Sequence, residues 1–106
     1  MSEDLILCVS SAYEEKFYFN PRYHTLPKAI REELQIICVM HTMEVGGVLT
    51  VSFDEEGHIY LTASSTEEDF AYDEIGANLL LKRMQQEKAE FFEGLELYYV
   101  SFFLNS

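Results

Sequence analysis

Basic residues are scarce in this chain, and their scarcity excludes one large class of function. The 106 residues include 7 lysines and arginines against 19 aspartates and glutamates, for a formal net charge of −12. Proteins that bind nucleic acid must neutralise phosphates with positive side chains, so we expect no direct binding of DNA or RNA. Anionic membrane surfaces are disfavoured for the same electrostatic reason.

Long apolar runs, cysteine pairs and catalytic motifs are also missing. No run approaches the roughly 18 apolar residues that a membrane-spanning helix needs. The two cysteines, Cys8 and Cys38, stand in separate apolar runs, where a thiol behaves as a small buried hydrophobe. No Cys-x-x-Cys pair, phosphate-binding glycine loop or Gly-x-Ser-x-Gly elbow is present. We therefore assign no catalytic, cofactor-binding or metal-binding residue and no cofactor, and we expect a protein that is not an enzyme.

The N-terminal residues carry acids where a secretory signal carries lysine or arginine. The apolar run that follows, residues 5–9, is too short for a signal sequence. We expect a cytoplasmic protein with both thiols reduced. No repeat, low-complexity tract or Gly/Ser linker divides the chain, so we expect a single domain over residues 1–106.

An antiparallel β-hairpin with strands 48–54 and 58–63 is the clearest structural signal. Residues 54–57 form a turn that ends in glycine, as a type I turn followed by a left-handed residue requires. Pairing Asp54 with His58 places three apolar pairs on one face: Phe53 with Ile59, Val51 with Leu61, and Leu49 with Ala63. The opposite face then pairs Ser52 with Tyr60 and Thr50 with Thr62. Turn chemistry and face assignment agree on one register.

Helices are predicted around the hairpin, which makes the fold class α+β. A capping-box spacing between Ser11 and Glu14 favours a helix over residues 12–19. Pro27 begins a helix over 27–44, whose apolar residues recur at spacings of three and four. A second capping-box spacing, Ser65 with Glu68, favours a helix over 67–75. Residues 5–9 fit either a buried strand or a helix.

The strongest helical period lies in residues 79–103, where aromatic residues gather. A continuous helix of that length would extend about 37 Å at ~1.5 Å per residue, roughly the diameter of a domain of this size. The aromatic residues of 13–23 are expected to pack against it. The hairpin and the short helix predicted over residues 12–19 are too small to cover every apolar stripe of residues 79–103. We therefore expect a homodimer formed either helix to helix or through hairpin edges. The alternative is a monomer in which residues 20–26 cover the remaining face.

The predicted interaction face therefore combines one stripe of the last helix with the outer face of the hairpin. Its residues are Phe92, Tyr99, Phe103, Thr50, Ser52, Tyr60 and Thr62.

The three histidines and the acidic segments suit structural roles better than metal binding. We expect His24 in a loop, His58 in an ion pair with Asp54, and a charged His41 at the end of its helix. The acids of 67–74 and of the 54–57 turn lack the alternating ligands and central glycine of a calcium loop.

Short segments spread over nearly the whole chain form a recognisable set: Tyr13-Glu14-x-Lys16-Phe17-Tyr18-Phe19-Asn20, Leu26-Pro27, Glu33-Leu34, Cys38-Val39, Val45-Gly46-Gly47, Tyr72-Asp73-Glu74-Ile75-Gly76, Gln86-Glu87-Lys88 and Leu95-Glu96-x-Tyr98-Tyr99. Through these segments the chain resembles a family of short acidic proteins from clostridial bacteria, which is identified only as a domain of unknown function. The resemblance implies one domain and a bacterial cytosolic setting, and it implies no activity, ligand or site residue.

These observations favour a non-enzymatic protein-protein interaction module, an adaptor or a chaperone-like protein, that forms a homodimer and contacts a protein partner. The alternative is a small-molecule or metal-binding protein, including an enzyme, with a pocket between the hairpin and the aromatic helices.

Overall fold

The predicted hairpin is present with the predicted register. In the computed structural model, which describes residues 3–104, strands β3 (Val48–Phe53) and β4 (Ile59–Ser64) pair antiparallel. All five predicted cross-strand pairs occur, from Leu49 with Ala63 to Phe53 with Ile59. The turn places Gly57 at a φ of 95°, a value that glycine adopts without steric cost. The α+β class is confirmed.

Two further strands complete the sheet, and one of them is the predicted strand at residues 5–9. Strand β1 (Ile6–Ser11) lies between β3 and β2 (Lys16–Phe19), so the order is β2-β1-β3-β4 with antiparallel neighbours throughout. The helical alternative for this segment is wrong. The side chains of Leu7 and Cys8 are both fully buried, and a register shift between Ile6 and Cys8 interrupts the regular alternation of faces at this point, so neighbouring residues are both apolar.

The helix predicted over residues 12–19 is wrong, because this segment is a turn followed by β2. The predicted bond between Ser11 and Glu14 does form: the Glu14 N–H donates to Ser11 Oγ at 3.3 Å. In this context it closes the β1–β2 turn, a role that serine fills as readily as a helix cap. The alternation of Phe17 and Phe19 places both rings on the core side of the sheet, whereas a helix would separate them.

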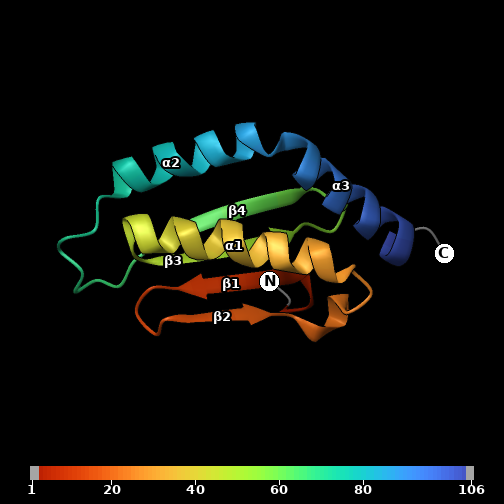
Figure 1. Cartoon of the computed structure of the whole chain (residues 1–106), viewed down its shortest axis with the longest axis horizontal. Helices are drawn as coiled ribbons and strands as arrows, with labels where there is room; N and C mark the ends of the chain where they lie inside the picture. The colour runs from red at the N-terminus through yellow and green to blue at the C-terminus, as the bar shows by residue number, and fades with distance from the viewer. Residues whose placement is uncertain (1–2, 105–106) are drawn as a thin grey trace.

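Helix α1 (Lys28–Val45) confirms the predicted helix over 27–44, and it packs across β1 and β3. Small side chains mediate the contact with β1. Ser10 Oγ lies 2.8 Å from Thr42 Oγ1, and the sulfurs of Cys8 and Cys38 are 3.9 Å apart. Figure 1 shows α1 lying lengthwise along the sheet.

The predicted helix over 67–75 is wrong, and the next helix, α2 (Glu74–Glu87), begins at its far end. Asp73 caps α2 by accepting a hydrogen bond from the Gly76 N–H at 3.0 Å. The preceding segment is held as a loop, because the Tyr13 hydroxyl donates to Asp69 and accepts from the Thr66 N–H. These contacts across the chain replace the local capping box that the sequence favours.

The continuous helix predicted over 79–103 is also wrong. The chain breaks at Lys88 and continues as α3 (Ala89–Tyr99) and a π-helical turn, η3 (Val100–Leu104). Lys88 has non-helical backbone angles, and its Nζ lies 3.0 Å from Glu33 Oε2, which ties the break to α1. The break turns α3 down over one end of the sheet (Figure 1).

The helices share one core with one face of the sheet. Leu49, Val51 and Phe53 cluster with buried residues of all three helices. The end of the core is aromatic: the rings of Phe53 and Tyr99 have centroids 4.5 Å apart, and Tyr23 contacts both. Tyr23 belongs to the short η2 turn (Pro21–Tyr23), so residues 20–26 do cover part of the last helix. Within residues 3–104 no helix is long and apolar enough to cross a membrane.

Substitution of Gly57 tests the turn that sets the hairpin register. We expect Gly57→Ala to lower the free energy of unfolding by about 1–2 kcal/mol, because a side chain is strained at positive φ. An added Cβ would also lie only 3.0 Å from Val100 Cγ2. Gly94→Ala is the matched control, since Gly94 lies inside α3 with open space around it and alanine has the higher helix propensity. Urea denaturation that shows equal effects for the two substitutions contradicts this prediction.

Candidate functional site

The predicted helical half of the interaction face is mostly buried. Phe92 is 6% exposed and Tyr99 is 4% exposed, and both belong to the core. Phe103 is half-buried beneath Arg22, whose guanidinium carbon lies 4.5 Å from the ring centroid. Because a buried ring has no surface left for a partner, Phe92 and Tyr99 serve the fold. The predicted stripe lies on the inner side of α3 because the break at Lys88 changes the direction of the helix.

The predicted strand half of the interaction face lies on the other side of the sheet. Thr50, Ser52, Tyr60 and Thr62 alternate with the core residues of β3 and β4, as the register requires. Thr62 is exposed, Thr50 and Tyr60 are half-buried, and Ser52 is buried. The sheet therefore separates these residues from the aromatic side chains of α3, and the predicted residues do not form one surface.

Apolar side chains are exposed on α1 and α2, and again on α3 and η3. Those of α3 and η3 are Leu97 at 69% exposed, Val100 at 41%, Phe102 at 60% and Leu104 at 44%. Val100 and Leu104 lie beside Gly57 of the hairpin turn, and the ring of Phe102 stacks on Tyr98. The sequence contains this signal, because residues 97–104 include no charged side chain. Their exposure could not be derived from a uniform helical period, because a π-helical turn has a wider spacing than an α-helix and rotates the outward face.

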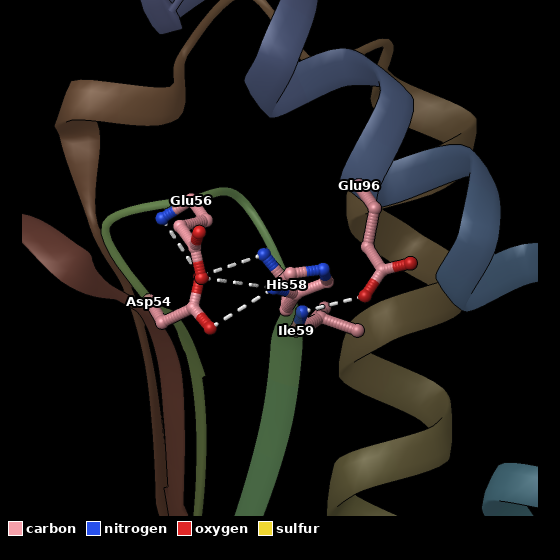
Figure 2. A network of polar contacts seen from close by, with 5 residues as sticks. All are labelled: Asp54, Glu56, His58, Ile59 and Glu96. Atoms are coloured by element: carbon pink, nitrogen blue, oxygen red, sulfur yellow. Dashed lines mark hydrogen bonds and ion pairs between the residues drawn. The ribbon is translucent and has the colours of Figure 1, made fainter.

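The tip of the β3–β4 hairpin brings together Asp54, Glu56 and His58, whose ligand-type atoms all lie within 4.8 Å of one another. Figure 2 shows the carboxylate of Asp54 at the centre of this group. It accepts hydrogen bonds from the backbone N–H groups of Glu56 and His58, both at 2.9 Å, and its other oxygen lies 3.2 Å from His58 Nδ1. The predicted pairing of His58 with Asp54 is thus present. The His58 N–H is the main cause of a lowered Asp54 pKa, and the whole arrangement is explained as a stabilised turn.

A second carboxylate beside the hairpin protects one edge of the sheet. Glu96 on α3 accepts a hydrogen bond from the Ile59 N–H at 2.7 Å (Figure 2). Next to the turn, the Asp54 N–H donates to the His58 carbonyl, and this bond fixes which residues of β3 and β4 are hydrogen-bonded pairs. Ile59 is the next residue, so its N–H points away from β3. Glu96 therefore satisfies a backbone donor that an unprotected edge strand would offer to another chain.

The opposite edge of the sheet, strand β2, borders a groove beside α1. The groove contains two cavities, of about 630 and 330 Å³, which share Phe17 and Gln35 in their linings. The larger cavity lies between the β1–β2 turn and the C-terminal half of α1, and Val39 and Met43 contribute apolar walls. The smaller cavity lies at the N-terminal end of α1, beside Lys28 and Arg31.

A separate cleft of about 380 Å³ lies between α1 and α2, and a buried histidine lines it. His41 is 4% exposed, and neither ring nitrogen has a hydrogen-bond partner among residues 3–104. Burial lowers the pKa of His41, and Glu44 opposes this shift. The expectation that a charged His41 caps its helix is therefore wrong: the helix ends with the Gly46 N–H donating to the Thr42 carbonyl.

The two cysteines are buried side by side between β1 and α1, as their apolar sequence contexts predict. The neighbouring Cys38 thiol raises the pKa of Cys8, and burial raises it further. Because the thiolate is the reactive species, both effects make Cys8 a poor nucleophile.

Comparison with known proteins identifies a family. The model of DUF6145, a family of unknown function, matches residues 4–106. No curated protein and no solved structure matches the chain.

The buried His41 predicts a pH dependence of stability. A folded-state pKa below that of the unfolded chain means that the unfolded chain takes up the proton first as pH falls. The contribution of His41 to stability is therefore complete above about pH 6.5 and decreases below it. We expect His41→Leu to be at least as stable as the native chain at neutral pH, because it removes two unpaired buried nitrogens. It should also lose less stability on acidification.

Urea denaturation at neutral and mildly acidic pH measures this effect. The other charged groups around the cleft, Glu33, Glu44, Glu87 and Lys88, are unchanged in the variant. Replacement of the exposed His24 by leucine is the control and should leave the pH dependence as it is. If His41→Leu and the native chain lose the same free energy of unfolding on acidification, burial of His41 is not the cause.

Proposed function

The chain belongs to DUF6145, a family of unknown function, and we propose from its surface that it is a non-enzymatic protein-protein interaction module that acts as a homodimer. The observation that carries this proposal is the uncharged apolar surface of α3 and η3, formed by Leu97, Val100, Phe102 and Leu104. We place the protein in the cytoplasm, where the two buried thiols, Cys8 and Cys38, remain reduced.

Electrostatics favours this surface as the contact between two copies. Each copy carries a formal charge of −12, so association is opposed wherever acidic surfaces meet. Residues 97–104 contain no charged side chain, and two copies meeting there keep most carboxylates apart. A two-fold interface uses the same patch on both copies, which doubles the apolar area that leaves water.

The alternative of a ligand pocket between the hairpin and the aromatic helix has less support. Phe53 and Tyr99 pack ring against ring in that region, and Gly57 lies close against Val100. The clefts described above lie elsewhere, beside α1. The metal-binding alternative is weakened because backbone N–H groups and His58 already bind the Asp54 carboxylate.

Sedimentation equilibrium tests the homodimer. We expect the native chain to be a dimer at micromolar concentration and Leu97→Asp or Phe102→Asp to weaken association about tenfold to a hundredfold, because each places a charge in an apolar contact. Both side chains are exposed, so the substitutions should leave the fold intact.

Ile75→Asp is the matched control, since Ile75 is equally exposed but lies on α2, away from the proposed contact. It should remain dimeric. A native chain that sediments as a monomer, or dimers that persist in both the Leu97 and the Phe102 variants, would refute this interface.

A further inference from the structure

The backbone of β2 offers unpaired hydrogen-bonding groups at the edge of the sheet. The Asn20 N–H donates to the Leu7 carbonyl at 2.9 Å, which makes Asn20 and Leu7 a hydrogen-bonded pair of the β1–β2 ladder. Because such pairs alternate in an antiparallel ladder, Tyr18 and Lys16 face β1 in the same way. The N–H and C=O groups of Phe17 and Phe19 therefore point away from the sheet. In the described part of the chain, no strand lies on that side of β2.

The two edges of the sheet are treated differently. At β4, α3 supplies Glu96 to bind the outward N–H of Ile59, and α2 packs close by. At β2, the outward groups border the groove with α1 instead. An edge strand without protection tends to pair with another strand. In this sheet the edge at β4 is protected, whereas the edge at β2 borders a groove.

The shape of the groove is suited to binding an extended polypeptide segment. The smaller cavity lies between β2 and α1, the larger one lies between α1 and the end of β1, the β1–β2 turn and the start of β2, and the two share Phe17 and Gln35. A strand added beside β2 directs alternate side chains toward the helical side of the sheet. Successive side chains of that kind would enter the two cavities. Strand addition of this type combines affinity from main-chain hydrogen bonds with specificity from side-chain pockets.

The charge of the groove differs from that of the whole chain. Its basic residues are Lys16, Lys28 and Arg31, and its acids are Glu15 and Glu32, whereas the chain as a whole has a charge of −12. Nε of Arg31 is buried and has no hydrogen-bond partner within residues 3–104, and its guanidinium lies 6.0 Å from the Phe19 ring centroid. A carboxylate is the complementary group for this end of the groove.

We propose that the groove between β2 and α1 binds an extended acidic segment of a partner protein, which adds to the sheet as a fifth strand beside β2. One apolar side chain of the segment occupies the larger cavity, against Phe17, Val39 and Met43. A carboxylate of the segment binds Lys28 and Arg31 at the other end. This inference deepens the proposed interaction function by naming a partner chemistry, and it uses a surface separate from α3 and η3.

Selection from a random-peptide display library, followed by hydrogen exchange with the selected peptides, tests the proposal on the full chain. We expect selected peptides to alternate apolar with polar residues and to carry Asp or Glu. On binding, the amides of Phe17 and Phe19 should become protected by about tenfold or more, because they gain hydrogen bonds. The amides of Lys16 and Tyr18, which face β1, should change little. A library that selects no peptide, or bound peptides that leave Phe17 and Phe19 exchanging as in the free protein, overturns the proposal.

Charge reversal supplies the second measurement. The pair Lys28→Glu and Arg31→Glu should weaken peptide binding at least about tenfold, because it removes the groups that bind the carboxylate. The control pair, Lys82→Glu and Arg83→Glu, makes the same change of net charge at exposed positions of α2 and should have little effect. If both pairs of substitutions weaken peptide binding equally, the effect comes from net charge alone. That result overturns the assignment of the carboxylate to Lys28 and Arg31.

The two proposals fail in different ways. A protein that sediments as a dimer but selects no peptide refutes the groove alone, whereas a monomer that binds the peptides refutes the α3–η3 interface alone.

Discussion

The packing of Tyr99 on Phe53 is the contact on which the rest of the C-terminal half depends. Their ring centroids are 4.5 Å apart, and Tyr23 closes the cluster from the η2 turn. Aromatic pairs of this kind bury large apolar areas and add a specific geometry. The break at Lys88 turns α3 toward the end of the hairpin (Figure 1), where Tyr99 packs on Phe53. The same turn places Glu96 against the edge of β4 and leaves Leu97 and Phe102 facing outward.

The sequence predicts those parts of the fold in which local chemistry and tertiary structure agree. The hairpin register follows from Gly57 and the alternation of β3, and α1 follows from its apolar spacing, since in both cases the local preference is also the native structure. The prediction fails at residues 12–19 and 67–75. The bond between Ser11 and Glu14 forms but closes the β1–β2 turn, and the Tyr13 hydroxyl binds Asp69 and the Thr66 N–H, which holds the second segment as a loop. Periodicity alone also cannot detect the break at Lys88, because both sides of it keep helical spacing.

The candidate site was less predictable than the fold, for a related reason. Assigning a face to the last helix requires its direction, which is set by the aromatic cluster rather than by the spacing of Phe92, Tyr99 and Phe103. The groove beside β2 depends on recognising β2 as a strand, and the orphaned nitrogens of His41 depend on how α2 covers α1. Each of these features arises from contacts between distant segments, so a single sequence contains no direct signal for them.

The strand order also has a consequence for how the chain folds. Strands β1 and β2 form one local hairpin, and β3 and β4 form another, so each needs only a short turn to close. The two hairpins join through β1 and β3, which are separated along the chain by the whole of α1. Long-range pairing must close a large loop before its contacts can stabilise it, and it is slower than local pairing. We therefore expect the docking of β1 on β3 to be slower than the closure of either hairpin.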